Sequence, residues 1–371
     1  MIVLPYLPSL RAVREGTQTA ARPFVTANKV TLLRLALLPL GGWLIYQGVS
    51  GQWAALVLLT LLGCTDFVDG YLARKQGPTV LGGLMDPIAD KIFVAVIFLP
   101  MTDPRIGWLD PLLVALIMMR EFLVTAARTS YQRRGITLRS TYLAKIKTWE
   151  QMSAGAFFFL ARVIERRSSF IAVLVACALL PLVAAGLYWL LRKRFWRGAF
   201  IFSGVFVGLT LLSLWVDQTT WSRIVLVGTV ALTWYTGGSY FTNIRKLDAE
   251  RPLDSIDMSR LVGALLLPAI AVALLGRGGG PAWALIGLLC AEFAMGGLDN
   301  LLVHHNRLES GAAWAARLMS EILLLTAALI ATKAGAPGVA PWLVVLAVGI
   351  ACGVGGIVFV RERDAYLAPR G

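Results

Sequence analysis

Long apolar runs, separated by short polar stretches, recur along all 371 residues of the chain. A run of about 20 apolar residues is long enough to cross the hydrocarbon core of a bilayer as one helix. The pattern therefore predicts an all-α, polytopic integral membrane helical bundle of about twelve transmembrane helices. We expect these helices near 31–48, 52–74, 85–101, 107–128, 149–163, 168–191, 197–216, 222–241, 259–275, 281–303, 312–332 and 340–360.

Residues 1–27 do not follow this pattern. They carry Arg11, Arg14 and Arg22 among small and apolar residues, without the layout of a signal peptide. We expect a cytoplasmic or interfacial N-terminal arm there. The remainder is expected to divide into a catalytic membrane domain at 28–194 and a C-terminal transmembrane domain at 195–371.

Charge sets the expected orientation. The chain is 57% hydrophobic, only 15% charged, and has a net charge of +14. Lys and Arg gather before the first span, at 74–75, across 128–147, and at 192–197, 245–251, 304–307 and 361–363. The positive-inside rule then predicts both termini and residues 66–90 on the cytoplasmic side of a cell membrane. Arg162, Arg166 and Arg167 break this rule, so a re-entrant or tilted hairpin is expected near them. Because the bases flank apolar spans, they favour anionic lipid and phosphorylated substrates over nucleic acid.

Cysteine and histidine offer little chemistry. Cys64, Cys177, Cys290 and Cys352 each lie within an apolar run and lack the spacing of a zinc site, so we expect small buried side chains. The two histidines are adjacent, at 304 and 305. A metal site built on imidazole is therefore disfavoured.

Four aspartates lie within 25 residues of an otherwise apolar region: Asp66, Asp69, Asp86 and Asp90. Carboxylates at membrane depth are costly and indicate function. Spacings of three and four residues place each pair on one helix face. Two such helices can surround one or two hard divalent cations, Mg²⁺ or Mn²⁺. The alternative is a salt-bridged helix pair, with Arg74 and Lys91 neutralising the acids.

These residues resemble the signature of the CDP-alcohol phosphatidyltransferase family, D-x2-D-G-x2-A-R-x8-G-x3-D-x3-D. All eight signature residues are present: Asp66, Asp69, Gly70, Ala73, Arg74, Gly82, Asp86 and Asp90. Seven residues separate Arg74 from Gly82 where the signature has eight, a departure that leaves both helical pairs intact. The resemblance covers roughly residues 24–191.

The resemblance implies a six-helix transferase domain that takes CDP-diacylglycerol as donor, with the acyl chains in the bilayer. Asp66, Asp69, Asp86 and Asp90 would hold two Mg²⁺ or Mn²⁺ ions, and Asp90 would also act as general base on the acceptor hydroxyl. The cytidine diphosphate would meet Gly70, Ala73, Arg74 and Gly82, with Arg34 beside the phosphates. CMP would leave. A bacterial-type inner membrane, a role in phospholipid biosynthesis and a possible homodimer belong to the same expectation.

The basic region after the fourth expected span points to the acceptor. Arg120 and Arg128 precede it, and Lys145 and Lys147 stand in the motif Lys-x-Lys-Thr-x-x-Gln. This motif is similar to that of one branch, the bacterial phosphatidylglycerophosphate synthases, and implies glycerol 3-phosphate as acceptor. Inositol phosphate is the alternative acceptor.

The second half of the chain holds no complete motif. An offset of 230 residues aligns Trp53 with Trp283 and Asp69 with Asp299, which suggests a degenerate second copy. On this alignment Gly296, Ala316 and Ser320 replace the other three aspartates. The alternative is that apolar spans resemble one another by composition. Glu292, Asp299 and Glu321 are membrane-depth acids, for which Arg317 is the expected partner. A rival interpretation of the whole chain is a twelve-span transporter or flippase with carboxylate cation sites.

Overall fold

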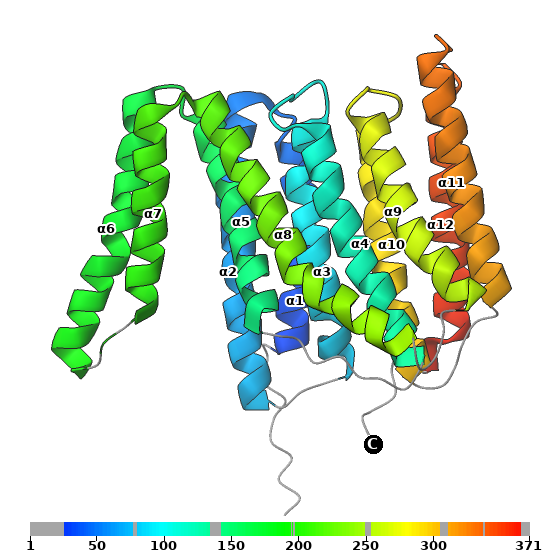
Figure 1. The fold of residues 1–371 in the computed structure, drawn as a ribbon, viewed down its shortest axis with the longest axis horizontal. Helices are drawn as coiled ribbons and strands as arrows, with labels where there is room; N and C mark the ends of the chain where they lie inside the picture. The colour runs from blue at the N-terminus through cyan, green and yellow to red at the C-terminus, as the bar shows by residue number, and fades with distance from the viewer. Residues whose placement is uncertain are drawn as a thin grey trace, which may run out of the picture.

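The computed structural model describes residues 26–76, 80–133, 142–193, 195, 197–248, 254–304, 311–336 and 338–364. These residues form twelve α-helices and one short 3-10 helix, η1 (Pro100–Thr102), without any β-strand (Figure 1). The helices are α1 (Ala27–Leu44), α2 (Gly48–Gln76), α3 (Val80–Phe98), α4 (Pro111–Arg133), α5 (Tyr142–Val163), α6 (Arg167–Arg192), α7 (Arg197–Trp215), α8 (Gln218–Asp248), α9 (Ser255–Leu275), α10 (Ala282–His304), α11 (Gly311–Lys333) and α12 (Ala340–Arg361). The all-helical prediction and the expected order of helices are confirmed.

Seven of the described helices are long and apolar enough to cross a membrane: α2, α6, α7, α9, α10, α11 and α12. A helix satisfies its own backbone hydrogen bonds, which makes it suited to a solvent without water. The chain is therefore a multi-pass membrane protein. The other five helices run beside these seven in the same bundle (Figure 1).

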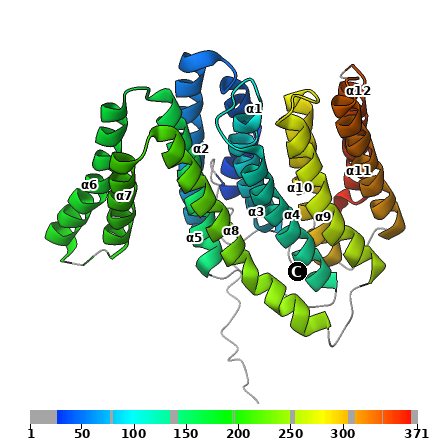
Figure 2. The same cartoon turned by 45° about the horizontal axis from the view of Figure 1, so that its top comes forward.

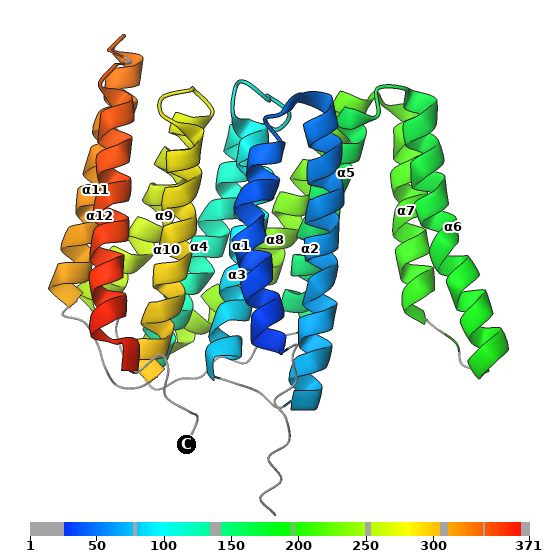
Figure 3. The same ribbon diagram turned by 180° about the vertical axis from the view of Figure 1, so that it is seen from behind.

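Successive helices alternate in direction, so α1 begins and α12 ends at the same end of the bundle (Figures 1 and 3). We call this the lower end, as it is drawn in Figure 1. The last turns of α2 and the first turns of α3 also lie there. At this end Arg133 ties α4 to α9, because its guanidinium lies 2.8 Å from Asp257 and 3.1 Å from Asp254.

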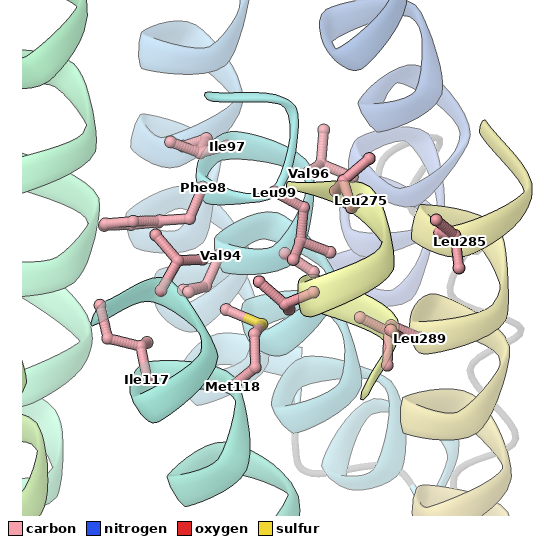
Figure 4. Close-up of a cluster of buried hydrophobic side chains, with 14 of the residues drawn as sticks. Val94, Val96, Ile97, Phe98, Leu99, Ile117, Met118, Leu275, Leu285 and Leu289 are labelled. Carbon is pink, nitrogen blue, oxygen red and sulfur yellow. The ribbon is translucent and has the colours of Figure 1, made fainter. Parts of the chain in front are cut away.

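One apolar core joins the first and second halves of the chain. In Figure 4, Val94 and Phe98 of α3 lie with Met118 of α4, Leu275 of α9 and Leu289 of α10. Each of these side chains is almost fully buried. Helix α3, which carries Asp86 and Asp90, is thus packed directly against α10 of the C-terminal half. The domain boundary is expected between residues 194 and 195, and residue 194 is outside the described residues.

Helices α6 and α7 pair with each other and stand apart from the main bundle (Figures 1 and 2). A separate small cluster, which includes Phe170 and Trp221, packs at their upper end. The expectation of a re-entrant hairpin near Arg162 is wrong, because α5 and α6 are both continuous helices that meet at the upper end. Arg167 instead donates to the carbonyls of Ser213 and Leu214, 2.9 Å from each, and so caps the end of α7.

Candidate active site

Three helices bring the signature residues together at the lower end of the bundle. Helix α1 packs against both α2 and α3. Asp66 and Asp69 share one face of α2, and Asp86 and Asp90 share one face of α3. The predicted helical placement of both pairs is confirmed. Thr26 begins the arrangement by capping α1, where its side chain accepts from the backbone N–H of Lys29.

Arg34 of α1 is the centre of the cluster. Its side chain is fully buried, and its guanidinium lies 2.9 Å from a carboxylate oxygen of Asp66. The same group is 3.5 Å from Asp90 and 3.8 Å from Asp69. A guanidinium on α1 therefore bridges acids from both other helices. Such a buried charge is tolerated in an apolar bundle because opposite charges surround it.

Thr31, one turn before Arg34, links Asp69 of α2 to Asp86 of α3. Its hydroxyl oxygen lies 3.1 Å from a carboxylate oxygen of Asp69 and 3.2 Å from one of Asp86. The carbonyl of Ala27 is also within 3.2 Å. A hydroxyl has one proton to donate, so these acceptors share it in turn. Thr31 and Arg34 together hold the facing sides of α2 and α3 against α1.

The four carboxylates differ in access to solvent. The side chain of Asp69 is only 4% exposed, whereas those of Asp66 and Asp90 are 31% and 29% exposed. Asp66 and Asp90 therefore face the part of the site that a substrate can reach. Asp69 lies behind them, against Thr31 and Arg34.

The donor set suits a hard divalent cation. It offers carboxylate oxygens only, and four negative charges surround the single positive charge of Arg34, an excess that a cation relieves. The arrangement is nevertheless organised around the guanidinium. Among the described side chains, no three acidic, histidine or cysteine groups are placed to hold one ion. The two-metal assignment of Asp66, Asp69, Asp86 and Asp90 therefore stays a prediction that rests on donor chemistry.

The other signature residues lie on the neighbouring turns. Gly70, Ala73 and Arg74 are on the last turns of α2, and Gly82 is on the first turn of α3. Arg74 is exposed. A side chain at Gly70 would meet only the guanidinium of Arg74, at 3.7 Å, so this surface is open to a ligand.

The alternative pairing of the acids with Arg74 and Lys91 is not the one observed. Arg34 supplies the described ion pairs to the cluster. Lys91 instead contacts the hydroxyl of Thr125 on α4. From the sequence, Arg34 is expected beside substrate phosphates, and its role as counter-ion of the aspartates is not predicted. Its position one turn inside an apolar span was the available signal.

One of the expected substrate-binding arginines, Arg120, lies in a separate polar network. Arg120 of α4 is buried beside Glu121, at 3.2 Å, and donates to the hydroxyl of Thr236 on α8 at 3.4 Å. Gln151 of α5 joins the same group by donating to Thr233 at 3.0 Å. This α4–α5–α8 network was not expected from sequence. Arg128 is half-buried two turns further along α4. Lys145 and Lys147 fall in the first turns of α5, and their side chains are outside the described set.

Comparison with known proteins agrees with the signature. The model of the CDP-alcohol phosphatidyltransferase family matches residues 24–183. The chain is 35% identical over 149 residues to the CDP-diacylglycerol–glycerol-3-phosphate 3-phosphatidyltransferase of Bacillus subtilis strain 168, covering 35% of this chain and 74% of that protein.

Proteins with the same name in two other bacteria are similar. The one from Cereibacter sphaeroides is 38% identical over 145 residues, which cover 37% of this chain and 64% of that protein. The one from Escherichia coli K12 is 31% identical over 132 residues, 34% of this chain and 72% of that protein. No solved structure matches the chain. The family match ends near the end of α6, so it does not extend to α7–α12.

Proposed function

Because this chain belongs to the CDP-alcohol phosphatidyltransferase family, we propose that it moves the phosphatidyl group of CDP-diacylglycerol to sn-glycerol 3-phosphate and releases CMP. The reaction is a step of phospholipid biosynthesis. The observation that carries the proposal is the cluster of four aspartates around Arg34, built from the family signature on α2 and α3. The similarity to three bacterial proteins with this activity in their names supports the acceptor.

The donor is proposed to bind at the lower ends of α2 and α3. Its acyl chains stay in the bilayer, where α2 presents exposed Phe67, Val68 and Tyr71. Its diphosphate lies over Gly70 and Arg74. The open surface at Gly70 permits close approach, and the exposed guanidinium of Arg74 offers a planar fork for phosphate oxygens.

The acceptor hydroxyl is proposed to lose its proton to Asp90, whose carboxylate is partly exposed. The resulting alkoxide attacks the β-phosphorus, and the bond to the CMP oxygen breaks. Bound Mg²⁺ or Mn²⁺ would neutralise the charge that builds on the phosphoryl oxygens, with Asp66, Asp69 and Asp86 as the residues that hold it. Lys145 and Lys147 are proposed to meet the phosphate of glycerol 3-phosphate.

The active site is proposed to face the cytoplasm of a bacterial-type cell membrane. The positive-inside rule supports this side, since Arg74, Lys75 and Arg133 end their helices at the lower end. Glycerol 3-phosphate is a charged metabolite that does not cross lipid, so its source must lie on the side of the site.

The test is CMP release by the purified chain from CDP-diacylglycerol with Mg²⁺ or Mn²⁺. Asp69→Asn is expected to abolish release, because the change removes one negative charge from the buried centre of the cluster. Asp364→Asn is the matched control, since that side chain is 84% exposed near the end of α12. Equal rates in the two variants would remove the aspartate cluster from the reaction. A transporter, the rival interpretation, releases no CMP at all.

A further inference from the structure

A second buried polar site lies in the C-terminal half of the bundle, between α4, α9, α10 and α11. The cavity encloses about 50 Å³. Its polar lining is made by Thr125, Thr129, Arg260, Glu292, Asp299 and Arg317. None of these residues belongs to the family signature, and four of them lie beyond the matched residues 24–183. Charged side chains at membrane depth are expensive, so such a group calls for an explanation in function.

Arg317 of α11 is fully engaged by acids. Its guanidinium contacts Glu292 of α10 twice, with one contact at 3.1 Å, and lies 2.9 Å from Glu321 one turn along α11. A bidentate pair of this kind compensates both charges. The expected pairing of Arg317 is confirmed for Glu292 and Glu321, whereas Asp299 pairs with Arg260 instead. The two members of this group that line the cavity, Arg317 and Glu292, are therefore paired without a ligand, while Oε2 of Glu321, which does not line it, has no hydrogen-bond partner.

Arg260 of α9 is not satisfied. It is 6% exposed, and its Nε has no hydrogen-bond partner. Its ion pair with Asp299 is 3.6 Å long, and it makes no hydrogen bond to any described residue. A buried guanidinium carries several N–H donors, and each one left without an acceptor costs free energy. Because Arg260 lines the cavity, an acceptor inside the cavity is the missing partner.

The surroundings of Arg260 fix its plane. Its guanidinium lies over the ring of Trp314, 4.5 Å from the ring centroid, and Asp299 is at its Nη2 edge. A stacked guanidinium presents its remaining N–H groups as a rigid fork, which matches the oxygens of a phosphate. Thr129 adds a hydroxyl to the lining.

Hydrogen-bond donors and size decide between ligand classes. The charged side chains of the lining balance, Arg260 and Arg317 against Glu292 and Asp299, so net charge favours neither a cation nor an anion. The donors of Arg260 still lack acceptors, and they favour a ligand with acceptor oxygens. A water molecule needs about 10–15 Å³ of such a cavity, so the space holds about four waters. Four oxygens are also the number in one phosphate group.

We propose that this cavity is a second phosphate-binding site, in which Arg260 holds the phosphate of a small phosphate ester or of a lipid headgroup. Arg260 lies within two turns of the start of α9, and Asp299 lies within two turns of the end of α10. Both helix ends are at the lower end, so the cavity is on the same side of the bundle as the aspartate cluster (Figure 1). Helix α3 carries Asp86 and Asp90 and α4 lines the cavity, and Lys91 of α3 contacts Thr125 of α4 between the two sites.

Equilibrium dialysis of the purified full chain against labelled inorganic phosphate, with EDTA present, tests the proposal. Wild type is expected to hold one phosphate per chain that Arg260→Gln binds at least tenfold more weakly. Arg277→Gln is the matched control, because that arginine is exposed just beyond the other end of α9. Native mass spectrometry with dihexanoyl phosphatidylglycerol forms the second arm. Binding of that lipid but not of inorganic phosphate, lost in Arg260→Gln, identifies a headgroup as the source.

Arg260→Lys keeps the charge beside Asp299 and so protects folding while it removes the planar fork. It is expected to bind phosphate more weakly than wild type. Unchanged affinity in Arg260→Lys, equal loss in Arg277→Gln, or an absence of Arg260-dependent binding with both probes would each overturn the proposal. CMP release by Arg260→Gln is expected within twofold of wild type. If the transferase proposal fails, the wild-type protein releases no CMP. The phosphate-binding measurement does not depend on CMP release, so it still tests the second site.

Discussion

Replacement of Arg34 by glutamine tests the electrostatic construction of the aspartate cluster. The guanidinium is fully buried and lies within 3.8 Å of three carboxylates from two helices. Glutamine is shorter and neutral, so the variant leaves the acids of α2 and α3 facing one another without their counter-ion. We expect α1, α2 and α3 to separate more readily at this end.

The size of the effect follows from the burial of the partners. Removal of one member of a buried ion pair costs about 3–5 kcal/mol. Asp66 and Asp90 are 31% and 29% exposed, so solvent screens part of the repulsion. The lower value, about 3 kcal/mol, is therefore expected, which for a chain of this size is a fall in Tm of about 4 °C. A divalent cation that binds the freed carboxylates would restore part of this loss.

The assay is thermal unfolding of the purified chain in detergent, in EDTA and again in Mg²⁺. Arg34→Gln is expected to unfold at a lower temperature than wild type in EDTA and to gain more from Mg²⁺. Arg223→Gln, an exposed arginine on the first turns of α8, is the control and is expected to behave as wild type. A variant as stable as wild type in EDTA would refute the counter-ion role. An equal Mg²⁺ response in both would show that the excess negative charge does not attract the cation.

Three further predictions concern individual residues. Asp90→Asn is expected to lower turnover far more than donor binding, because a general base acts in the transition state; equal loss of both, measured on one preparation, would make Asp90 mainly a ligand. Lys145→Ala and Lys147→Ala are each expected to raise the KM for glycerol 3-phosphate with little change in the KM for CDP-diacylglycerol, and a reversed pattern in steady-state kinetics would place them at the donor. Asp299→Asn is expected to leave CMP release almost intact, and a large loss with folding preserved would bring the second half into the reaction.

The helices and the signature were predictable because their signals are local. The length of an apolar run of about 20 residues predicts the length of the helix directly. Spacings of three and four residues predict that two side chains share one face of that helix. Asp66, Asp69, Asp86 and Asp90 therefore fell on the expected helices. The bond between Arg317 and Glu321 was open to prediction for the same reason, since the two are one turn apart.

Contacts between distant helices were not predictable in this way. Arg34 is separated from Asp66 by 32 residues, and only the packing of α1 against α2 shows that the arginine is the counter-ion of the acids. Arg120 is 116 residues from Thr236, so the sequence favours a substrate-binding role for this arginine and does not predict the contact. Arg167 breaks the positive-inside rule. The carbonyl groups on α7 to which it donates are 46 and 47 residues away, so the sequence does not predict these contacts.

The relation between the two halves also lies beyond the sequence signal. The offset of 230 residues pairs Asp69 with Asp299, and each of these aspartates has an arginine partner, Arg34 at 3.8 Å and Arg260 at 3.6 Å. This parallel is in keeping with a degenerate second copy, which stays a prediction. Superposition of α9–α11 on α1–α3, with Asp299 on Asp69, is its test.

The central claim is that the Arg34-centred aspartates catalyse phosphatidyl transfer to glycerol 3-phosphate. The most direct measurement is CMP release by the purified chain from CDP-diacylglycerol and Mg²⁺, with glycerol 3-phosphate, inositol phosphate or no acceptor. We expect release that depends on glycerol 3-phosphate, yields phosphatidylglycerophosphate in equal amount, and is absent in Asp69→Asn. Preference for inositol phosphate would correct the acceptor alone. An absence of CMP release with every acceptor, from a folded preparation, would contradict the account.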